Sequence, residues 1–234
     1  MKCFQLEIKG RWAHFKRPET NNNPLSHDII TKTALIGMIG AVLGIERKKM
    51  KGLFPVLSED LLYNVQTLDI IRKVSIGLTS WKVPSNETTR KSFEMLKEPD
   101  FLVTLALTNI RSSDIYESFK ECVINQKAVY TPVLGWHNCP AELKYISEGD
   151  LSDNVQKGDY CTKGFVVTDD FTPQVDMNFR VGFDKLPTFQ NNDFWNLPNK
   201  YVQVIYPEYP HQLRGAGRYN VYKSKLHEEC LCMI

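Results

Sequence analysis

One stretch of the chain, residues 33–45, is so uniformly apolar that it constrains the fold more than any other. Apolar side chains occur on nearly every side of a helix drawn through it, and Thr31 or Thr33 is placed to cap that helix. A helix that is apolar all round must be buried. Each of its glycines costs about 1 kcal/mol relative to alanine, so we expect them to allow close packing against a sheet. The three glycines, spaced three and four residues apart along one side, are Gly37, Gly40 and Gly44.

A strand is predicted before this helix, and an unusually long loop joins the two. Phe4, Leu6 and Ile8 alternate with polar residues, which is the period of a strand with one buried face. The loop at 10–32 has more than twenty residues, whereas a connection between a strand and a helix usually needs about 2–6. Long loops in compact domains are usually functional or disordered.

The first part of this loop, residues 9–17, mixes cations with aromatic side chains. Such a mixture suits single-stranded nucleic acid, because cations contact phosphates and rings stack on bases at about 1–3 kcal/mol per base. The alternative is structural: Trp12 and Phe15 would close an edge of the core, and the cations would only be solvated. The sequence leaves both interpretations open. The residues concerned are Lys9, Arg11, Trp12, His14, Phe15, Lys16 and Arg17.

The composition is that of an ordinary globular protein without a strong charge bias. Of 234 residues, 42% are hydrophobic and 24% are charged, and the formal net charge is only +2. Any nucleic-acid surface must therefore be local. The N-terminus lacks the apolar core of a signal peptide, and residues 33–45 are fewer than the roughly 20 needed to cross a bilayer. We expect a cytoplasmic protein without membrane contact.

The six cysteines are scattered without a CxxC pair, which predicts free thiols rather than a disulfide framework. Near the C-terminus, His227, Cys230 and Cys232 could ligate zinc, but no second cluster of ligands accompanies them. We therefore expect neither a metal nor another cofactor.

The periodicity of residues 1–134 predicts the element order βαββαβ, with a polar insertion between the second and third strands. This order is the split βαβ plan that ferredoxin-like domains share with RNA-recognition (RRM-like) domains. We expect an α+β fold whose first domain has this plan. The predicted strands are 3–8, 68–78, 101–107 and 128–134, the predicted helices are 33–45 and 114–123, and the insertion is 80–99.

Residues 135–234 predict strands without a further convincing helix, so we expect a β-rich C-terminal lobe. Its most distinctive segment is the glycine-rich stretch 212–218, interpreted as a turn flanked by Arg214 and Arg218. Such a turn could bring backbone N–H groups and guanidinium groups to phosphates, and a tight hairpin without a ligand is an equal alternative. It lacks the spacing of a nucleotide-binding P-loop. The predicted strands are 165–168, 174–183, 201–206 and 219–222.

Two stretches carry a family resemblance: GRWAHFKRPETNNNPLSHDIITKTALIGMIGAVLG at 10–44 and YTPVLGWHNCPAEL at 130–143. They resemble the Cas-five family, the CRISPR-associated subunit of type I Cascade surveillance complexes, and are most similar to subtype I-B relatives. The resemblance implies a ferredoxin-like domain of the RAMP superfamily that binds the 5′ handle of the crRNA. It also implies the following partners: a Cas-seven-type backbone subunit, a Cas-eight-type large PAM-reading subunit, a Cas-six-type processing nuclease of the same system, and target DNA contacted through the complex.

The resemblance further implies a thumb-like hairpin between the second and third strands that helps to hold the handle. The insertion at 80–99 lies in the matching place. Lys82, Arg90, Lys91 and Lys97 give it a basic surface, although an ordinary charged loop is the alternative.

From these features we expect the 9–17 loop and Lys32 to clamp the handle, with bases stacked on Trp12 or Phe15. The insertion would hook the strand where the handle meets the spacer. The predicted RNA-binding residues are Arg11, Trp12, His14, Phe15, Lys16, Arg17, Lys32, Lys82, Arg90, Lys91, Arg214 and Arg218.

One subtype of the family (I-C) cuts its own pre-crRNA without metal, so a metal-independent endoribonuclease is the alternative function. That chemistry needs a base for the 2′-OH, an acid for the leaving oxygen and a cation for the phosphorane. His14 and Lys16 are the best candidates, because they lie close together in a basic loop. Plain RNA binding would use the same residues, and the I-B-like relatives leave cutting to a separate subunit, so we predict no catalysis. Further candidates for these roles are His27, His137, Lys32 and Tyr130.

Overall fold

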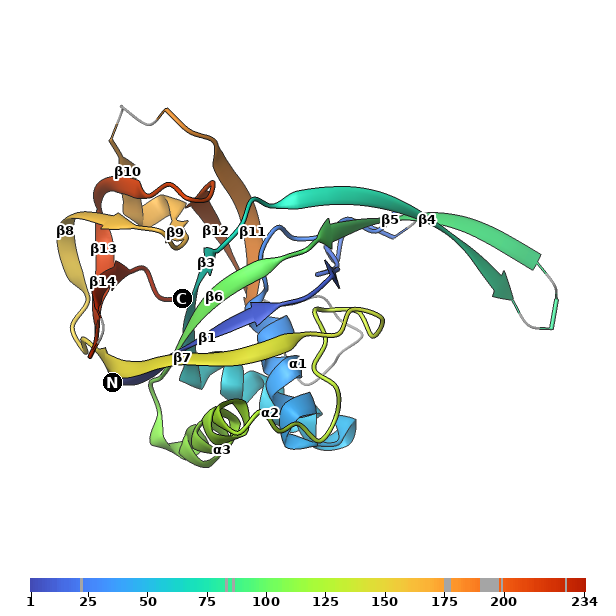
Figure 1. Ribbon diagram of the computed structural model, residues 1–234, viewed down its shortest axis with the longest axis horizontal. Helices are drawn as coiled ribbons and strands as arrows, with labels where there is room; N and C mark the ends of the chain where they lie inside the picture. Colours follow the sequence, from blue (N-terminus) through green and yellow to red (C-terminus); the bar gives the residue numbers. More distant parts are fainter. Residues whose placement is uncertain are drawn as a thin grey trace.

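A computed structural model of the chain describes residues 1–21, 23–82, 84–85, 87–174, 178–189, 198, 200–225 and 227–234. The described part is an α+β fold built on antiparallel strands, as the sequence predicts. Figure 1 shows helices packed below a sheet, a β-rich region on one side and a long two-stranded arm on the other.

Four antiparallel strands form the centre of the main sheet, in the order β7 (Glu142–Leu151), β1 (Lys2–Lys9), β6 (Asp100–Leu107) and β3 (Leu61–Thr67). β1 lies in the interior because both of its edges are paired. Phe4, Leu6 and Ile8 of this strand are fully buried, as predicted. Phe4 packs against the rings of Tyr116 and Phe119, with centroid distances of 5.3 and 6.1 Å. The predicted strands at 3–8 and 101–107 are confirmed.

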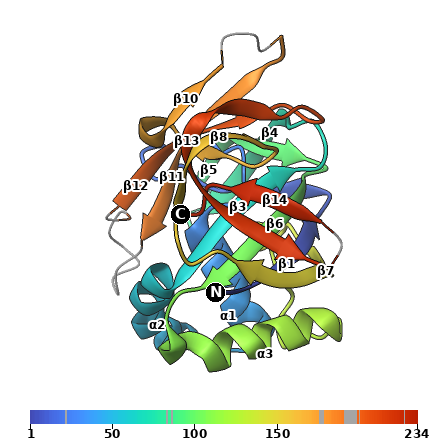
Figure 2. The same ribbon diagram turned by 90° about the vertical axis from the view of Figure 1, so that its left-hand side faces the viewer.

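Three helices of the described chain, α1 (Lys32–Leu43), α2 (Arg47–Asp60) and α3 (Ser113–Ile124), pack on one face of this sheet (Figures 1 and 2). The side chain of Thr31 caps α1 by accepting a hydrogen bond from the backbone N–H of Ala34. The expectation that the glycines of α1 face a sheet is wrong. Gly40 lies against Met50 of α2, and Gly44 ends the helix with a φ of 69°. The helix α2 was not predicted, because a basic run, a glycine and a proline obscure its period.

Strands from the second half of the chain cover the other face of the sheet. The long strand β13 (Leu213–Ser224) pairs with β7 and joins three shorter strands to the sheet. A separate small sheet lies beside α1. The shorter strands are β8 (Gln156–Thr162), β10 (Phe171–Pro173) and β14 (Glu228–Leu231), and the small sheet is β11 (Val181–Phe189), β12 (Lys200–Pro207) and β9 (Val166–Val167).

The glycine-rich stretch 212–218 was predicted as a turn, and this prediction is wrong. Its residues from Leu213 onward belong to β13, paired to β8 on one edge and to β10 on the other. Glycine is needed at Gly215 because a Cβ there would overlap the backbone of Thr172 in β10. Of the strand predicted at 174–183, residues 175–177 lie outside the described residues.

The arm is a β-hairpin of β4 (Arg72–Lys82) and β5 (Glu87–Lys97), with the short strand β2 (Trp12–Ala13) paired to its base. It leaves the main sheet between β3 and β6 and extends away from the body of the protein (Figure 1). The strand predicted at 68–78 is therefore wrong, because the apolar alternation there belongs mostly to the arm. The insertion predicted at 80–99 is correspondingly longer at its start.

The strand predicted at 128–134 is also wrong. That stretch is irregular, with one isolated bridge between Val133 and Pro140, and β7 completes the central four strands instead. The boundary expected at residue 134 thus falls before the last of these strands. The division into a domain at 1–134 and a lobe at 135–234 stays a prediction.

Candidate nucleic-acid interface

The two stretches that carry the family resemblance are folded against each other. The backbone N–H of His14 donates to the carbonyl oxygen of Leu134 at 3.0 Å. Gly135 has a φ of 81°, and a Cβ there would overlap the carbonyl oxygen of His14. Gly10 is also confined, since a Cβ would lie 2.7 Å from the carbonyl oxygen of Pro140. Glycine is required at these positions because the two backbones approach so closely.

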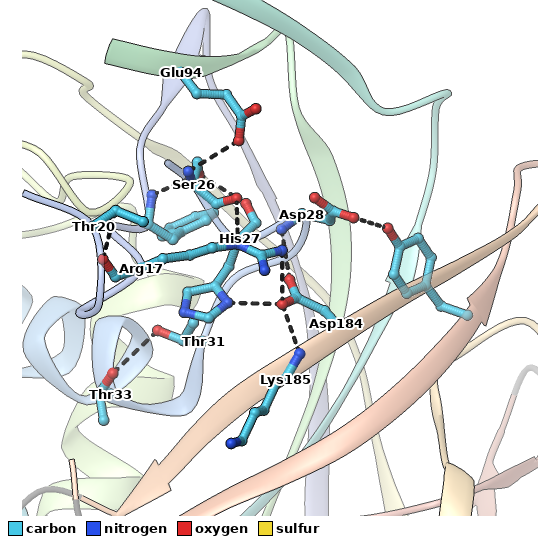
Figure 3. Close-up of polar contacts among 12 residues, drawn as sticks. Arg17, Thr20, Ser26, His27, Asp28, Thr31, Thr33, Glu94, Asp184 and Lys185 are labelled. Carbon is cyan, nitrogen blue, oxygen red and sulfur yellow. Dashed lines mark hydrogen bonds and ion pairs between the residues drawn. The ribbon is translucent and has the colours of Figure 1, made fainter. Parts of the chain in front are cut away.

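The 10–32 loop is anchored by Asp184 of β11, whose side chain is fully buried. Its carboxylate accepts hydrogen bonds from Nδ1 of His27 at 2.9 Å and from the backbone N–H of Asp28 at 2.8 Å. Nη2 of Arg17 lies 3.1 Å from the same carboxylate (Figure 3). Burial alone would raise the pKa of Asp184, but these hydrogen bonds and the charge of Arg17 hold that pKa below its ordinary value. The loop is therefore a fixed part of the fold.

A second set of contacts ties the loop to the base of the arm. Lys73 of β4 donates to Oε1 of Glu94 at 2.9 Å and to the carbonyl oxygen of Ser26 at 3.0 Å, and it also forms an ion pair with Asp28. The backbone N–H of Ser26 donates to the Glu94 carboxylate at 3.1 Å (Figure 3). Burial opposes the ionisation of Glu94, but the bonds from Lys73 and Ser26 hold its pKa below the ordinary value. Loop, arm and β11 are thus connected through polar side chains.

The ring of Phe15 and the imidazole of His14 point into the protein, being only 2% and 5% exposed. Nδ1 of His14 donates to the carbonyl oxygen of Glu94 at 2.8 Å, and the ring meets Phe93 edge-on at 5.7 Å. Burial lowers the pKa of His14, so the imidazole is neutral near pH 7. The structure favours the structural interpretation for these two residues, because no base can stack on Phe15 while it is buried.

The predicted cations differ in how far they are free to meet a ligand. Arg11 and Lys16 of the loop are exposed, as is Arg90 on β5, and Lys91 is half-buried. Arg17 is held by Asp184 and is 25% exposed. The side chain of Lys82 lies outside what the structure describes, and Trp12 is half-buried at the base of the arm.

Arg214 and Arg218 are exposed on β13, at the opposite end of the molecule from the arm (Figure 1). The structure does not bring them together with the loop cations. Nε of Arg218 lies 3.6 Å from a carboxylate oxygen of Asp170. Because this stretch is paired on both edges, it cannot wrap an anion in backbone N–H groups as a glycine-rich turn would.

A groove of about 350 Å³ opens beside the N-terminus of α1, and we name it the handle groove. It lies where the two stretches meet, since its lining includes Lys16, Thr33, Gly37 and Gly135. The exposed cation and the positive end of the helix dipole together favour an anion such as a phosphate.

Lys32 lies in the first turn of α1 and is only 4% exposed. No hydrogen bond or ion pair with the described residues holds its ammonium group. Burial, together with the nearby charge of Lys200, lowers the pKa of Lys32 to about 8. An anion at this helix end would relieve both effects.

Two tryptophans that were not predicted shape this region. Trp136, in the second stretch, stacks on Phe93 of β5 with a centroid distance of 5.0 Å and an interplanar angle of 8°. Trp81, near the tip of the arm, is 67% exposed, which is unusual for so large an apolar side chain. A tryptophan beside a lysine within a polar insertion was the available sequence signal for Trp81.

All six cysteines are free thiols, as expected. Among the described residues, no group of three or more His, Cys, Asp or Glu side chains is placed to hold a metal ion. Within the same part of the chain, none of the helices combines the length and the apolar character that spanning a bilayer requires.

The antiparallel sheet, the basic arm and the handle groove define an α+β protein with a candidate RNA-binding surface. Residues 3–150 match the family model described as CRISPR-associated protein (Cas_Cas5). The chain belongs to this family, and the resemblance of its two stretches is confirmed. It is 33% identical over 150 residues to the CRISPR system Cascade subunit CasD of Escherichia coli strain K12, a match that covers 58% of this chain and 65% of that relative.

Solved structures share the fold at low sequence identity. A CRISPR protein from Archaeoglobus fulgidus matches over 98% of this chain and 99% of its own, with a TM-score of 0.59 and 11% identity. A chain of a CRISPR RNA-guided surveillance complex matches over 88% of this chain and 90% of its own, with a TM-score of 0.51 and 14% identity. These likenesses support the α+β architecture.

Proposed function

We propose that this protein is a non-catalytic crRNA-binding subunit of a type I Cascade surveillance complex. It would hold the 5′ handle of the crRNA and cap the backbone next to the large subunit. Family membership and similarity to a Cascade subunit support the proposal. The same proposal includes subtype I-B, a cytoplasmic location, contacts with Cas-seven-type and Cas-eight-type subunits, a Cas-six-type nuclease in the same system, and target DNA reached through the complex.

The proposal treats the central strands as a ferredoxin-like unit. The antiparallel order β7-β1-β6-β3 fits this plan, as do the helices α1 and α2 between β1 and β3 and the helix α3 between β6 and β7. The arm then lies between the second and third strands, where the family resemblance implies a thumb-like hairpin.

The observation that carries the proposal is that the open groove and the exposed cations lie around the loop and the arm, while the sheet face used by RNA-recognition domains is covered. Gln5 and Gln66 on that face are buried, and each donates a side-chain hydrogen bond to the carboxylate of Glu229 in β14. Asn64, also buried there, donates to the carbonyl oxygens of Phe165 and Cys232. RNA contacts therefore belong to the loop and the arm.

The handle would be held by contacts of two kinds. Lys16 and the N-terminus of α1 would meet phosphates in the handle groove, with Lys32 adding charge beneath them. Along the arm, Arg90 and Lys91 would follow the backbone of the RNA, and Trp81 would stack on a base.

The endoribonuclease alternative is less well supported. A catalytic base must come within hydrogen-bond reach of the 2′-OH. His14 is buried, donates from Nδ1 to a backbone carbonyl and packs against Phe93, which are the properties of a structural histidine. Lys16 is exposed and fits phosphate binding without a catalytic partner.

A gel-shift titration with the repeat RNA of the protein's own locus, in EDTA, tests the proposal. We expect bound and uncut RNA, with a lower affinity and a shallower salt dependence in Lys16→Ala. Lys157→Ala on β8, at the far end of the molecule from the arm, is the matched control. Metal-independent cutting that is lost in His14→Ala would establish the nuclease instead, and equal binding by Lys16→Ala and wild type would remove the loop from the interface.

A further inference from the structure

A second groove, of about 610 Å³, lies between the end of α1 and the start of α2. Its lining is largely apolar and includes Ala41 of α1 and both Met50 and Phe54 of α2. Tyr130 forms one wall: its backbone N–H donates to the carbonyl oxygen of Ala41 at 3.0 Å, and the residue is 55% exposed. We name this surface the α1–α2 groove.

Gly37 keeps this groove open. A Cβ at Gly37 would meet only the ring of Phe54, at 3.9 Å, so packing within the chain does not require glycine there. Gly40 differs, because a Cβ there would lie 2.6 Å from the sulfur of Met50. Since glycine costs about 1 kcal/mol relative to alanine inside a helix, the missing side chain at Gly37 points to a molecule that enters the groove from outside.

The rim of the groove is strongly basic. The first two turns of α2 carry Arg47, Lys48, Lys49 and Lys51, all exposed. Cations at a helix N-terminus oppose the helix dipole, typically by about 0.3–1 kcal/mol each. The first turn contains no acidic residue, and the N-cap residue Glu46 makes no side-chain capping hydrogen bond. This charge is unfavourable for the helix itself and complementary to an acidic ligand.

We propose that the α1–α2 groove is the docking site for an amphipathic helix of a partner protein that carries acidic residues beside its apolar face. Small residues in the groove allow a helix to approach closely, and its acidic side chains would meet Lys48, Lys49 and Lys51. A nucleic acid fits less well, because a floor of glycine, alanine and methionine offers few donors or acceptors to a base.

The two grooves lie end to end along α1, since Gly37 and Phe54 line both of them. A helix bound in the α1–α2 groove would therefore lie next to the RNA handle. The identity of the partner rests on the proposed function: it is one of the protein subunits encoded with this chain.

The test is co-purification of this chain with the Cascade subunits and crRNA of its own locus. The first variant combines Lys48→Glu, Lys49→Glu and Lys51→Glu, a change that suits the dipole of α2 and preserves folding. The second is Ala41→Trp, which fills the α1–α2 groove and leaves the handle groove untouched. The control combines three distant reversals, Lys157→Glu, Lys163→Glu and Lys225→Glu.

We expect both groove variants to lose one protein subunit by about tenfold or more while their affinity for handle RNA is retained. Zero-length carbodiimide cross-linking of the wild-type complex should join the three lysines to carboxylates on a helix of that subunit. A full complement of subunits in both variants overturns the inference, and so does a loss of RNA with the proteins retained, which would identify a nucleic-acid surface.

The two proposals can fail separately in this experiment. A wild-type chain that recruits the subunit through these lysines but binds no handle RNA supports the docking site and contradicts the RNA function. A chain that binds RNA but recruits no protein does the reverse.

Discussion

Asp184 Oδ1 lies 2.9 Å from Nδ1 of His27, although the two residues are 157 positions apart in the chain. Both side chains are almost completely buried, at 0% and 2% exposure. The contact joins β11 of the second half to the loop that leads into α1. It therefore positions the handle groove without itself facing a ligand.

Asp184→Ala should destabilise the protein by about 3–5 kcal/mol, because it leaves His27 buried without its acceptor and Arg17 without its ion pair. The free energy of unfolding in urea measures the effect. Asp159→Ala, an exposed change on β8, should alter stability by less than about 0.5 kcal/mol. Equal stability of the two variants would show that Asp184 does not anchor the loop.

No feature of the sequence could predict this anchor. The strands at 3–8 and 101–107 and the helix at 33–45 were predictable because their periodicity is local and their apolar faces meet one core. The partner of His27 depends on where β11 lies in the folded chain. Asp184 itself stands among alternating residues of an ordinary strand and shows no local signal.

The wrong predictions have physical causes of the same kind. Val74, Ile76 and Leu78 alternate as a core strand would, but they form one face of a projecting hairpin. Glycines at 212–218 indicated a turn, yet Gly215 is needed for the close crossing of β10. Loop aromatics suggested base stacking, whereas Phe15 is held in the core by the tertiary contacts of the loop.

Gly135→Ala should destabilise the protein by about 1–3 kcal/mol or more, since it combines a left-handed φ with an overlap on His14. Gly77→Ala is the matched control, because a Cβ there meets nothing within 4 Å. Thermal unfolding of both variants distinguishes them. A Gly135→Ala protein as stable as wild type would mean that the two stretches need not approach so closely.

Lys32→Met should stabilise the free protein at pH 7 by on the order of 2–3 kcal/mol, because it removes a buried charge that has no partner. The pKa of Lys32 is lowered to about 8 in the folded state, while the unfolded chain keeps its proton up to about pH 10.4. The unfolded state therefore binds more protons between these values, and wild-type stability rises with pH across that window. The advantage of the variant should shrink accordingly by pH 10.

Urea unfolding of wild type and Lys32→Met at pH 7 and pH 10 measures this difference, with Lys163→Met as the exposed control. Under the proposed function the same variant binds handle RNA more weakly, so stability and affinity change in opposite directions. A less stable Lys32→Met protein at pH 7 would contradict the assignment of Lys32 as an unpartnered buried charge.

Trp81→Ala should weaken handle RNA binding by about 1–3 kcal/mol through the loss of one stacked base. The register of β4 and β5 pairs Trp81 with Thr88 and Thr79 with Arg90, so Trp81 and Arg90 lie on the same face of the arm. Leu78 lies on the opposite face and is 38% exposed, which makes Leu78→Ala the matched control. Trp81→Phe should retain most of the affinity, since it keeps an aromatic face. Because Trp81 is exposed, none of these changes should lower the unfolding temperature. If Leu78→Ala weakened binding and Trp81→Ala did not, the RNA would have to follow the apolar face of the arm.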